Sequence, residues 1–572
     1  MRRNRILALA LAGCALGAAI AAADSWAAHN DRGWHPPQHH WHHHPSPPPH
    51  HPCPLAANPD SYSTATHPVG GHQASISVEG SEGILANDCG EAPTIVANTE
   101  PTHGSLDLEA DGGFTYTPEA GFSGLDSFSY TIADAVHVYK TDLPPIGSFE
   151  GIQLAGGSFG SSLAPVPGHP DEFFGLEDRG PNVEAPGGFA IEPKPDYDPA
   201  IARFVFEDGE AELVERIPLR DSIGHPFSGL VNSQAPTNET IQNLKGVTLA
   251  HDPDGYDPEG LVALPDGSFW VSDEYGPFVT HFNSEGREIS RLSPFGGGLP
   301  AELAKRVPNR GMEGLTITPD GKTLVGMMQS ALQQTDLEGS DAKKLVPTRI
   351  VTYGLYTHQV HEYLFLLDEP ATLKTADSEI TAISNDTFLI DERDGNFPSA
   401  TGYKKLWKVS LEGATDVGPS AHVSGATYDG AAGGLLIGGK SIEKTVLGQK
   451  TAEAKTTLEG EGIKPVSSSL YLDVDQLLTA LNPTDAFYDH DKVEGVAALE
   501  GGKRIVISND NDFGISGAEE APLGSPNKWK LVTKVEPATG EQDTGEYLEV
   551  NMSALPAKTS TGTVTVNVNE AH

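Results

Sequence analysis

The chain has 572 residues and a formal net charge of −42, with 79 acidic and 37 basic side chains. This charge excludes nucleic acid and anionic membrane surfaces as favoured partners, and it suits divalent cations or simply solubility outside the cell. Hydrophobic residues make up 38% of the chain beside 63 Gly and 44 Pro, which is typical of a turn-rich β protein with room for two or more domains.

Residues 1–28 predict an export signal. Three arginines among the first five residues precede an apolar run from Ile6 to Ala23, and small residues follow it. We therefore expect a secreted, periplasmic or cell-surface bacterial protein with no transmembrane span. The phrase Leu11-Ala12-Gly13-Cys14 also matches a lipoprotein cleavage box, so lipid anchoring through Cys14 is the alternative.

Residues 29–68 predict a disordered linker, because a tract of His and Pro such as 39–49 cannot pack a core. Two interpretations stay open for this tract: a scavenger of zinc, copper or nickel, and a Pro-rich spacer beyond the export signal. Imidazole side chains suit those metals, so weak binding of Zn²⁺, Cu²⁺ or Ni²⁺ follows in either case.

Residues 69–135 predict a small β-sandwich. Alternating segments such as 101–108 and 111–118 contain Gly/Asp turns between their strands. These phrases resemble the cadherin-like, immunoglobulin-type repeats of bacterial surface and secreted proteins. The resemblance implies an adhesion or spacer module without catalysis, often associated with calcium. Within it, Asn87-Asp88 is interpreted as a turn, with a calcium ligand pair as the alternative.

Ordinary cleavage of the signal would leave Cys53 and Cys89 as the cysteines of the chain. Export permits a disulfide between them, and two unpaired cysteines are the equal alternative. Because neither lies in the repeat region, thiol catalysis and a Cys-ligated zinc are excluded there.

A short phrase recurs through the rest of the chain: Glu, usually Gly, alternating apolar residues, a turn, an apolar run and an acidic cluster. Its copies begin at Glu259, Glu313, Glu379 and Glu494, and a looser copy begins at Glu150. Each copy fits two antiparallel strands joined by a tight turn. The spacing of the copies predicts a β-propeller over residues 146–550, with six or seven blades, followed by a tail at 551–572.

Equivalent positions in the blades of a propeller lie around one axis, so the repeated acids are expected to converge. Such carboxylates bind a hard cation, for which calcium is the best fit, or act in acid–base catalysis. The alternative is that they cap turns and lock neighbouring blades, and Met327-Met328-Gln329 interrupts the acids in one blade. We assign Glu259, Glu313 and Glu494 as catalytic, Asp273, Glu274, Asp391, Asp510 and Asp512 as metal ligands, and Arg179, Arg310 and Arg393 as substrate-binding.

Several of these phrases together resemble one bacterial family, described as having esterase-like activity of phytase. The phrases are Tyr256–Leu261, Trp270–Pro277, Asn309–Leu315, Lys492–Gly495 and Ile507–Phe513. The resemblance implies a secreted β-propeller hydrolase that acts on phosphoesters such as phytate or on simple esters.

The sequence thus predicts an all-β protein, a propeller preceded by an Ig-like β-sandwich. Its predicted activity is cation-dependent hydrolysis of a small ester or phosphoester by a monomer. Two other functions stay open: a non-catalytic binding or adhesion propeller displayed by the sandwich, and a calcium-dependent lactonase.

Overall fold

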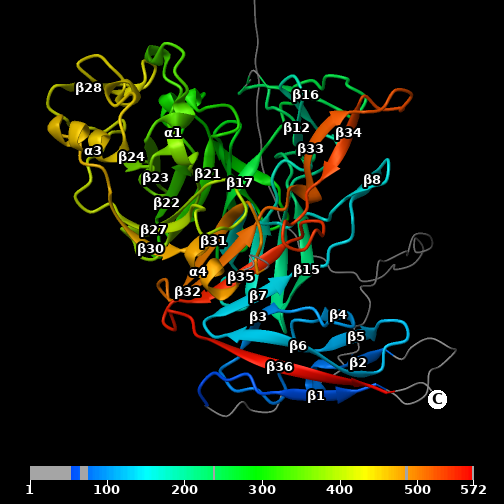
Figure 1. Cartoon of the computed structure of the whole chain (residues 1–572). Helices are drawn as coiled ribbons and strands as arrows, with labels where there is room; N and C mark the ends of the chain where they lie inside the picture. The colour runs from blue at the N-terminus through cyan, green and yellow to red at the C-terminus, as the bar shows by residue number, and fades with distance from the viewer. Residues whose placement is uncertain (1–52, 65–74, 236, 238, 484–486, 570–572) are drawn as a thin grey trace, which may run out of the picture. The chain divides into compact units, whose positions relative to one another are not determined.

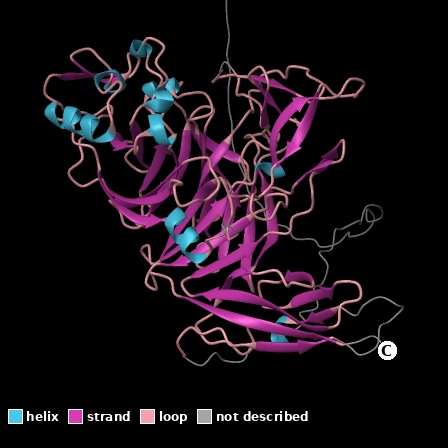
Figure 2. Ribbon diagram, in the orientation of Figure 1, coloured by secondary structure: helices cyan, strands magenta, loops and turns pink. Residues whose placement is uncertain are grey.

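The structure is a computed structural model that describes residues 53–64, 75–235, 237, 239–483 and 487–569. The expected export signal, the lipoprotein box at Cys14 and the His-rich tract lie outside these residues. Strands dominate the described part of the chain (Figure 2). Within that part, no helix is both long and apolar enough to cross a membrane.

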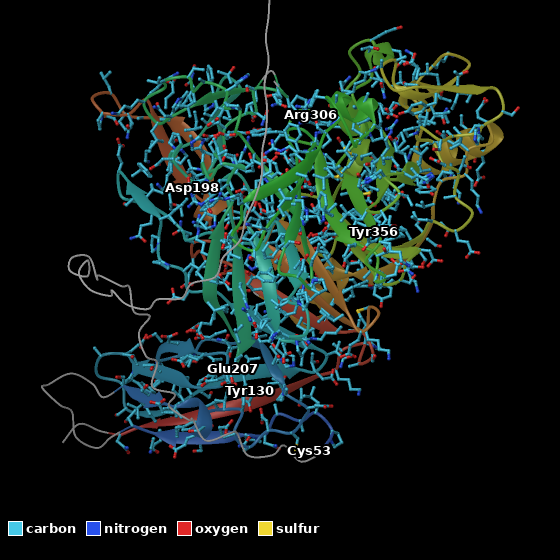
Figure 3. The ribbon with its side chains drawn as sticks, turned by 180° about the vertical axis from the view of Figure 1, so that it is seen from behind. Cys53, Tyr130, Asp198, Glu207, Arg306 and Tyr356 are labelled. Carbon is cyan, nitrogen blue, oxygen red and sulfur yellow. A yellow bond between two sulfur atoms is a disulfide. The ribbon has the colours of Figure 1, made fainter. Side chains whose placement is uncertain are left out.

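The smaller β unit consists of two sheets around one apolar core that includes Phe114, Phe128 and Tyr130 (Figure 3). The C-terminal strand β36 pairs with β6 and β1, so the end of the chain joins this sandwich (Figure 1). The first sheet contains β1 (Asp60–Ser63), β36 (Thr559–Val568), β6 (Gly124–Ala133) and β3 (Thr94–Asn98), and the second contains β2 (Ile76–Val78), β5 (Phe114–Pro118) and β4 (Gly104–Leu108).

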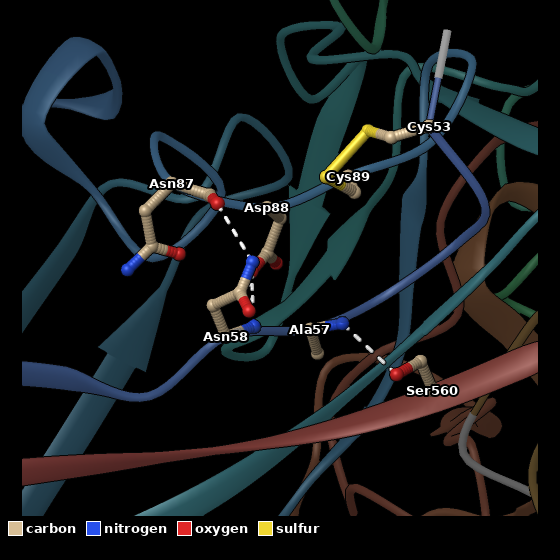
Figure 4. The surroundings of a disulfide bond; sticks show 7 residues. All are labelled: Cys53, Ala57, Asn58, Asn87, Asp88, Cys89 and Ser560. Atoms are coloured by element: carbon tan, nitrogen blue, oxygen red, sulfur yellow. Dashed lines mark hydrogen bonds between the residues drawn. A yellow bond between two sulfur atoms is a disulfide. The ribbon is translucent and has the colours of Figure 1, made fainter. Parts of the chain in front are cut away.

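Cys53 and Cys89 form a disulfide, which decides between the two alternatives left open by the sequence (Figure 4). The segment after Cys53 is also held by hydrogen bonds. The backbone N–H of Asn58 donates to Asp88 Oδ1 at 2.6 Å, and that of Ala57 donates to Ser560 Oγ at 2.9 Å. The Asp88 carboxylate also accepts a hydrogen bond from Tyr130 Oη at 3.0 Å, so it joins distant segments of the sandwich.

The propeller is built from four-stranded antiparallel sheets. Strand β7 pairs with β35 and, at one position, with β15, which joins two of these sheets into a single sheet of eight strands. From the innermost strand outward, the first blade is β10 (Ser162–Pro165), β11 (Glu172–Leu176), β14 (Ala200–Glu207) and β15 (Glu210–Pro218), and the second is β17 (Pro258–Ala263), β18 (Phe269–Asp273), β19 (Val279–Phe282) and β20 (Glu288–Leu292). In the same order, the third blade is β21 (Met312–Ile317), β22 (Thr323–Met328), β23 (Pro347–Gly354) and β24 (Val360–Leu366), the fourth is β25 (Ala376–Ala382), β26 (Thr387–Arg393), β27 (Lys404–Ser410) and β30 (Ser467–Asp473), and the fifth is β31 (Val493–Leu499), β32 (Arg504–Asn509), β35 (Glu546–Asn551) and β7 (Val136–Lys140).

The innermost strands β10, β17, β21, β25 and β31 each pack on the next, and β31 packs on β10 to close the ring. Five blades are therefore seen in the described residues, and the expected six or seven are not confirmed. The long gaps between repeats hold small additional elements instead of further blades. These are β8 (Gly147–Phe149), β9 (Ile152–Leu154), β12 (Val183–Ala185), β13 (Phe189–Ile191) and β16 (Thr240–Gln242) before Glu259, and β28 (Ala426–Asp429), β29 (Gly434–Ile437), α2 (Ile442–Thr445), α3 (Thr451–Gly460) and α4 (Val474–Leu481) before Glu494. Outside these two gaps lie α1 (Pro370–Leu373), β33 (Ile515–Glu520) and β34 (Trp529–Thr533).

The close packing of the innermost strands explains why a glycine follows most of the leading glutamates. A Cβ on Gly260 would lie 2.3 Å from Ser272 Oγ and 2.5 Å from the backbone N of Leu315 in the next blade. Gly314 and Gly495 are equally crowded by the neighbouring innermost strands. Only glycine lets the backbones approach this closely.

We expect Gly260→Ala to destabilise the fold by about 1–3 kcal/mol, because the added methyl overpacks a backbone contact. The measurement is the midpoint of denaturant unfolding. Gly296→Ala is the matched control, since a Cβ there would meet nothing within 4 Å. Equal midpoints for the two variants would contradict the close-approach explanation.

Candidate active site

The leading glutamates lie in β-bulges at the start of the innermost strands. The register between the first two strands shifts between Pro258 and Leu261, and equivalent shifts occur in the blades of Glu313 and Glu494. A bulge bends its strand and re-aims one side chain. Glu259, Glu313 and Glu494 are all buried, and the Coulomb interactions that raise the pKa of Glu259 include one from each of the other two. The structure thus brings together all three residues predicted to be catalytic.

Glu379 has a different role from the other leading glutamates. Its carboxylate accepts hydrogen bonds from the backbone N–H groups of Leu315, at 3.2 Å, and Ile380, at 2.9 Å. It also accepts a hydrogen bond from Ser162 Oγ on β10, and Ser162 Oγ itself accepts from Leu261 N at 3.1 Å. Glu379 therefore ties innermost strands together, which is the locking role considered as the alternative for the repeated acids.

The clearest candidate for a metal centre is formed by Asp257, Glu259 and Glu274. One carboxylate oxygen from each lies within 4.8 Å of the others, and all three side chains are buried. The side-chain amide nitrogen of Asn309 donates to Asp257 Oδ2 at 3.0 Å and to Glu274 Oε2 at 3.2 Å. Burial, followed by repulsion from Glu313 and its acidic neighbours, raises the pKa of Glu259 well above its usual range.

Sequence reasoning missed Asp257 and Asn309. Asp257 stands two residues before its leading glutamate, and Asp377 stands two residues before Glu379. The recurrence of this spacing in two blades was the signal that could have identified Asp257. Asn309 comes from the loop before β21, and no repeat pattern marks it.

Glu313 lies beside this centre, and its charge, after the larger effect of burial, raises the pKa of both Glu259 and Glu274. Gln329 Nε2 donates to Glu313 Oε1, so the glutamine that interrupts the acids has a place in the site. Glu274 Oε1 and Glu313 Oε2 are buried and have no hydrogen-bond partner among the described residues. Burial raises the pKa of Glu313 to about 7, which suits a group that exchanges protons near neutral pH.

The three predicted substrate-binding arginines have different surroundings. Arg310 lies close enough to Glu274 and Glu313 for their charges to act on it, yet its guanidinium has no hydrogen bond to any residue that the structure describes. Arg393 forms an ion pair with Glu494. Arg179 donates to Tyr275, Glu239 and Asn182, and its Nε lies 3.7 Å from Asp257 Oδ2 in the centre. Arg310 is therefore the guanidinium with free donors in the centre.

The predicted metal ligands also divide by their surroundings, and their roles stay predictions. Asp273 accepts hydrogen bonds from the backbone N–H groups of Asp257 and Gly276, which fix a turn. Asp510 pairs with Lys492 at 2.8 Å, and Asp512 pairs with Lys492 and with Lys534 at 2.9 Å. In contrast, both oxygens of Asp391 are buried without a hydrogen-bond partner among the described residues.

Without a bound cation, the stability of the fold should fall as the pH rises from about 5 to 8. Burial raises the pKa of Glu313 and of Glu494 from 4.5 to about 7. A raised carboxyl pKa means that the folded state binds the proton more tightly than the unfolded state. Its stabilisation is therefore complete below about 4.5 and lost as the pH passes 7, by about 3 kcal/mol per carboxyl group.

The measurement is thermal unfolding between pH 5 and 8 in the presence of a chelator. His490 adds to this fall above about pH 6.5, because Asp543 and Glu546, against the effect of burial, raise its pKa from 6.5 to about 10, so that the folded state keeps a proton that the unfolded state loses. A melting temperature that rises over this interval would contradict the expectation.

Comparison with known proteins agrees with this architecture. Residues 155–513 match the family described as esterase-like activity of phytase. The chain belongs to this family. The sequence resemblance is therefore confirmed over most of the propeller, and residues 53–141 match a bacterial Ig domain.

The chain is also similar to a protein of Arthroderma benhamiae described as an uncharacterized secreted protein. The two are 31% identical over 246 residues, which cover 34% of this chain and 47% of the relative. The matched region thus spans about half of that relative's length.

Similar solved structures include hydrazine synthase of Kuenenia stuttgartiensis, with 9% identity, a TM-score of 0.27 and coverage of 68% of this chain and 100% of that one. Virginiamycin B lyase of Staphylococcus aureus has 11% identity, a TM-score of 0.21 and coverage of 66% and 99%. The β-propeller domain of Cps50 (Swd1) of Myceliophteria thermophila has 9% identity, a TM-score of 0.19 and coverage of 49% and 72%. These TM-scores are too low to support a functional inference.

Proposed function

We propose that the protein is a secreted, calcium-dependent hydrolase of small phosphoesters or simple esters, with its active site on the propeller axis. The observation that carries this proposal is the convergence of Asp257, Glu259 and Glu274 within 4.8 Å of one another. Beside them lie the unpartnered oxygens of Glu274 and Glu313 and the free guanidinium of Arg310. The relative described as secreted and the predicted export signal support a location outside the cell.

The donor set of this centre fits calcium. Asp257, Glu259 and Glu274 offer carboxylate oxygens, which calcium prefers, and no described His or Cys lies in the group. Three buried carboxylates without a cation would strongly repel one another, and burial together with this repulsion raises the pKa of Glu259. When bound, the cation would supply Lewis-acid polarisation of a phosphoryl or carbonyl oxygen.

The chain's own residues supply substrate binding and proton transfer. Arg310 has free donors that suit the oxygens of a phosphoester or carboxyl group. Asn309 bridges Asp257 and Glu274 and so holds two of the carboxylates in position. Gln329 fixes the orientation of Glu313 through Oε1 and leaves Oε2 available.

Glu313 would act as the base and then as the acid of the hydrolysis. A water oxygen forms the new bond to phosphorus or to the carbonyl carbon while its proton moves to the Glu313 carboxylate. The bond to the leaving alcohol then breaks, and Glu313 returns the proton to the alcohol oxygen. A pKa of about 7 permits both transfers near neutral pH.

The test is hydrolysis of phytate, p-nitrophenyl phosphate and acyl esters by the purified mature chain, with calcium and with chelator. We expect turnover with calcium and none with chelator. An absence of turnover on the whole panel, together with specific binding of a glycan or protein, would overturn the proposal in favour of a non-catalytic propeller.

A further inference from the structure

A second group of buried acids lies away from the axis, where the segment between β27 and β30 covers the third blade. It consists of Glu302, Glu362 and Glu443 with Arg349 and Gln334, all at most 2% exposed. They come from separate parts of the chain: Glu302 precedes β21, Gln334 follows β22, Arg349 and Glu362 lie on β23 and β24, and Glu443 lies on α2. Neither the axial site nor the family match accounts for this group.

The charges of this group do not balance. Arg349 Nη1 forms an ion pair with Glu443, and Arg349 Nε lies 3.2 Å from Glu362 Oε2. No other cationic side chain among the described residues pairs with these three glutamates, so three carboxylates and one guanidinium leave a formal charge of −2. A buried net charge of this size is strongly unfavourable unless protons or a cation compensate it.

Each ligand candidate has one atom held in place and another left without a partner. Tyr428 Oη donates to Glu302 Oε2 at 2.8 Å, which leaves Glu302 Oε1 unpartnered. Gln334 Nε2 donates to the carbonyl of Gly433 at 3.1 Å, which fixes the amide and leaves Gln334 Oε1 unpartnered. Glu362 Oε1 and Glu443 Oε2 are likewise buried and without a partner.

Two of these free oxygens flank one loop, and the charges of Glu302 and Glu443 both act on the carboxyl group of Glu362. A Cβ on Gly433 would lie 2.7 Å from Gln334 Oε1, and one on the next residue, Gly434, would lie 2.7 Å from Glu302 Oε1. The loop between β28 and β29 therefore closes directly over both oxygens, and a side chain there would occupy the same space.

We infer that Glu302, Glu362 and Gln334 bind a divalent cation of the calcium class, which fastens the β28–α3 segment to the third blade. Oxygen-only donors, two of them charged, are the ligands that calcium prefers, and its charge matches the −2 of the group. The segment also packs on the blade through Val417, Leu435 and Ile442 against Val346 and Leu364. Figure 1 shows β28 and α3 beyond β24, far along the chain from the strands of that blade.

The test uses the mature chain and two readouts, bound calcium by elemental analysis and thermal unfolding with calcium or chelator. Glu362→Gln should lose one equivalent of calcium and retain ester hydrolysis. Because the neutral amide relieves buried repulsion, this variant should melt at a higher temperature than the wild type in chelator and respond less to calcium. Glu274→Gln should lose a different equivalent, so the axial proposal and this one can fail separately. The exposed Glu338→Gln is the control.

A second measurement needs no variant. Limited proteolysis of the wild type should cut within residues 411–466 faster in chelator than in calcium. The inference is overturned if Glu362→Gln keeps its full calcium content. It is also overturned if chelator changes neither the melting temperature nor the proteolysis of the wild type and the stability of the wild type falls with rising pH. In that case a proton shared by Glu302 and Glu362, and not a cation, would compensate the buried charge.

Discussion

Glu274→Gln is expected to lower kcat/KM for ester hydrolysis on the order of 10³-fold. Glu274 is one of three carboxylates within 4.8 Å of each other, and the charge of Glu313 acts on it. The amide keeps the size of the side chain but removes its charge, so it weakens the binding of the cation. The cation's polarisation of the substrate stabilises the transition state by several kcal/mol. The measurement is steady-state kinetics at increasing calcium on the substrate that the wild type cleaves best.

The control for this prediction is Glu338→Gln, because Glu338 is exposed and lies outside the axial site. It should keep wild-type kinetics. Circular dichroism and the melting temperature show whether Glu274→Gln is folded. A folded variant with full activity would place the reaction elsewhere, whereas partial rescue by high calcium would support a ligand role for Glu274.

Lys534→Met is expected to destabilise the fold by about 3–5 kcal/mol, the usual cost of removing one partner from a buried ion pair. The Lys534 ammonium is 3% exposed and lies 2.6 Å from Asp491, 2.9 Å from Asp512 and 3.0 Å from Asp543. Against the effect of burial, Lys492 and Lys534 hold the pKa of Asp512 below its usual range. Methionine keeps the apolar volume, leaves Asp491 without a cationic partner among the described residues, and leaves Asp512 only Lys492 and Asp543 only His490.

The measurement is the free energy of unfolding in denaturant at pH 7. Lys530→Met is the matched control, because Lys530 lies nearby on β34 and makes an exposed pair with Glu519 at 3.4 Å. Such a surface pair contributes only about 0–1 kcal/mol. If the two variants unfolded at the same midpoint, the buried network around Lys534 would not be an important source of stability.

The repeat was enough to predict the propeller and the convergence of Glu259, Glu313 and Glu494. A phrase that recurs with the same strand–turn–strand pattern must form equivalent units, and equivalent units around an axis place equivalent residues together. The number of blades did not follow from the spacing. The gap before Glu259 and the gap before Glu494 are filled by short strands, helices and loops, which leave no repeat in the sequence.

The roles of the individual acids depended on contacts between distant residues. Asp273 and Glu274 are neighbours in the sequence, yet Asp273 accepts backbone hydrogen bonds and Glu274 faces Glu259. Successive side chains of a strand point to opposite faces, and the bulges shift that alternation from blade to blade. Asn309 and Gln329 carried no pattern that could assign them to the site.

The sequence by itself determined the class of the protein, an all-β chain with a propeller and an Ig-like unit, because alternation, turns and repeats are local properties. It also supplied the excess of carboxylates that a cation site requires. Only the tertiary structure decided which carboxylates are free to bind. Glu379 is occupied by Ser162 and by the backbone N–H of Leu315 from a neighbouring blade, Glu494 by Arg393, and Asp512 by Lys492 and Lys534. Asp257, Glu259 and Glu274 are left together because no cationic side chain neutralises all three. Such partners come from other strands or other blades, so the spacing of the acids cannot predict them.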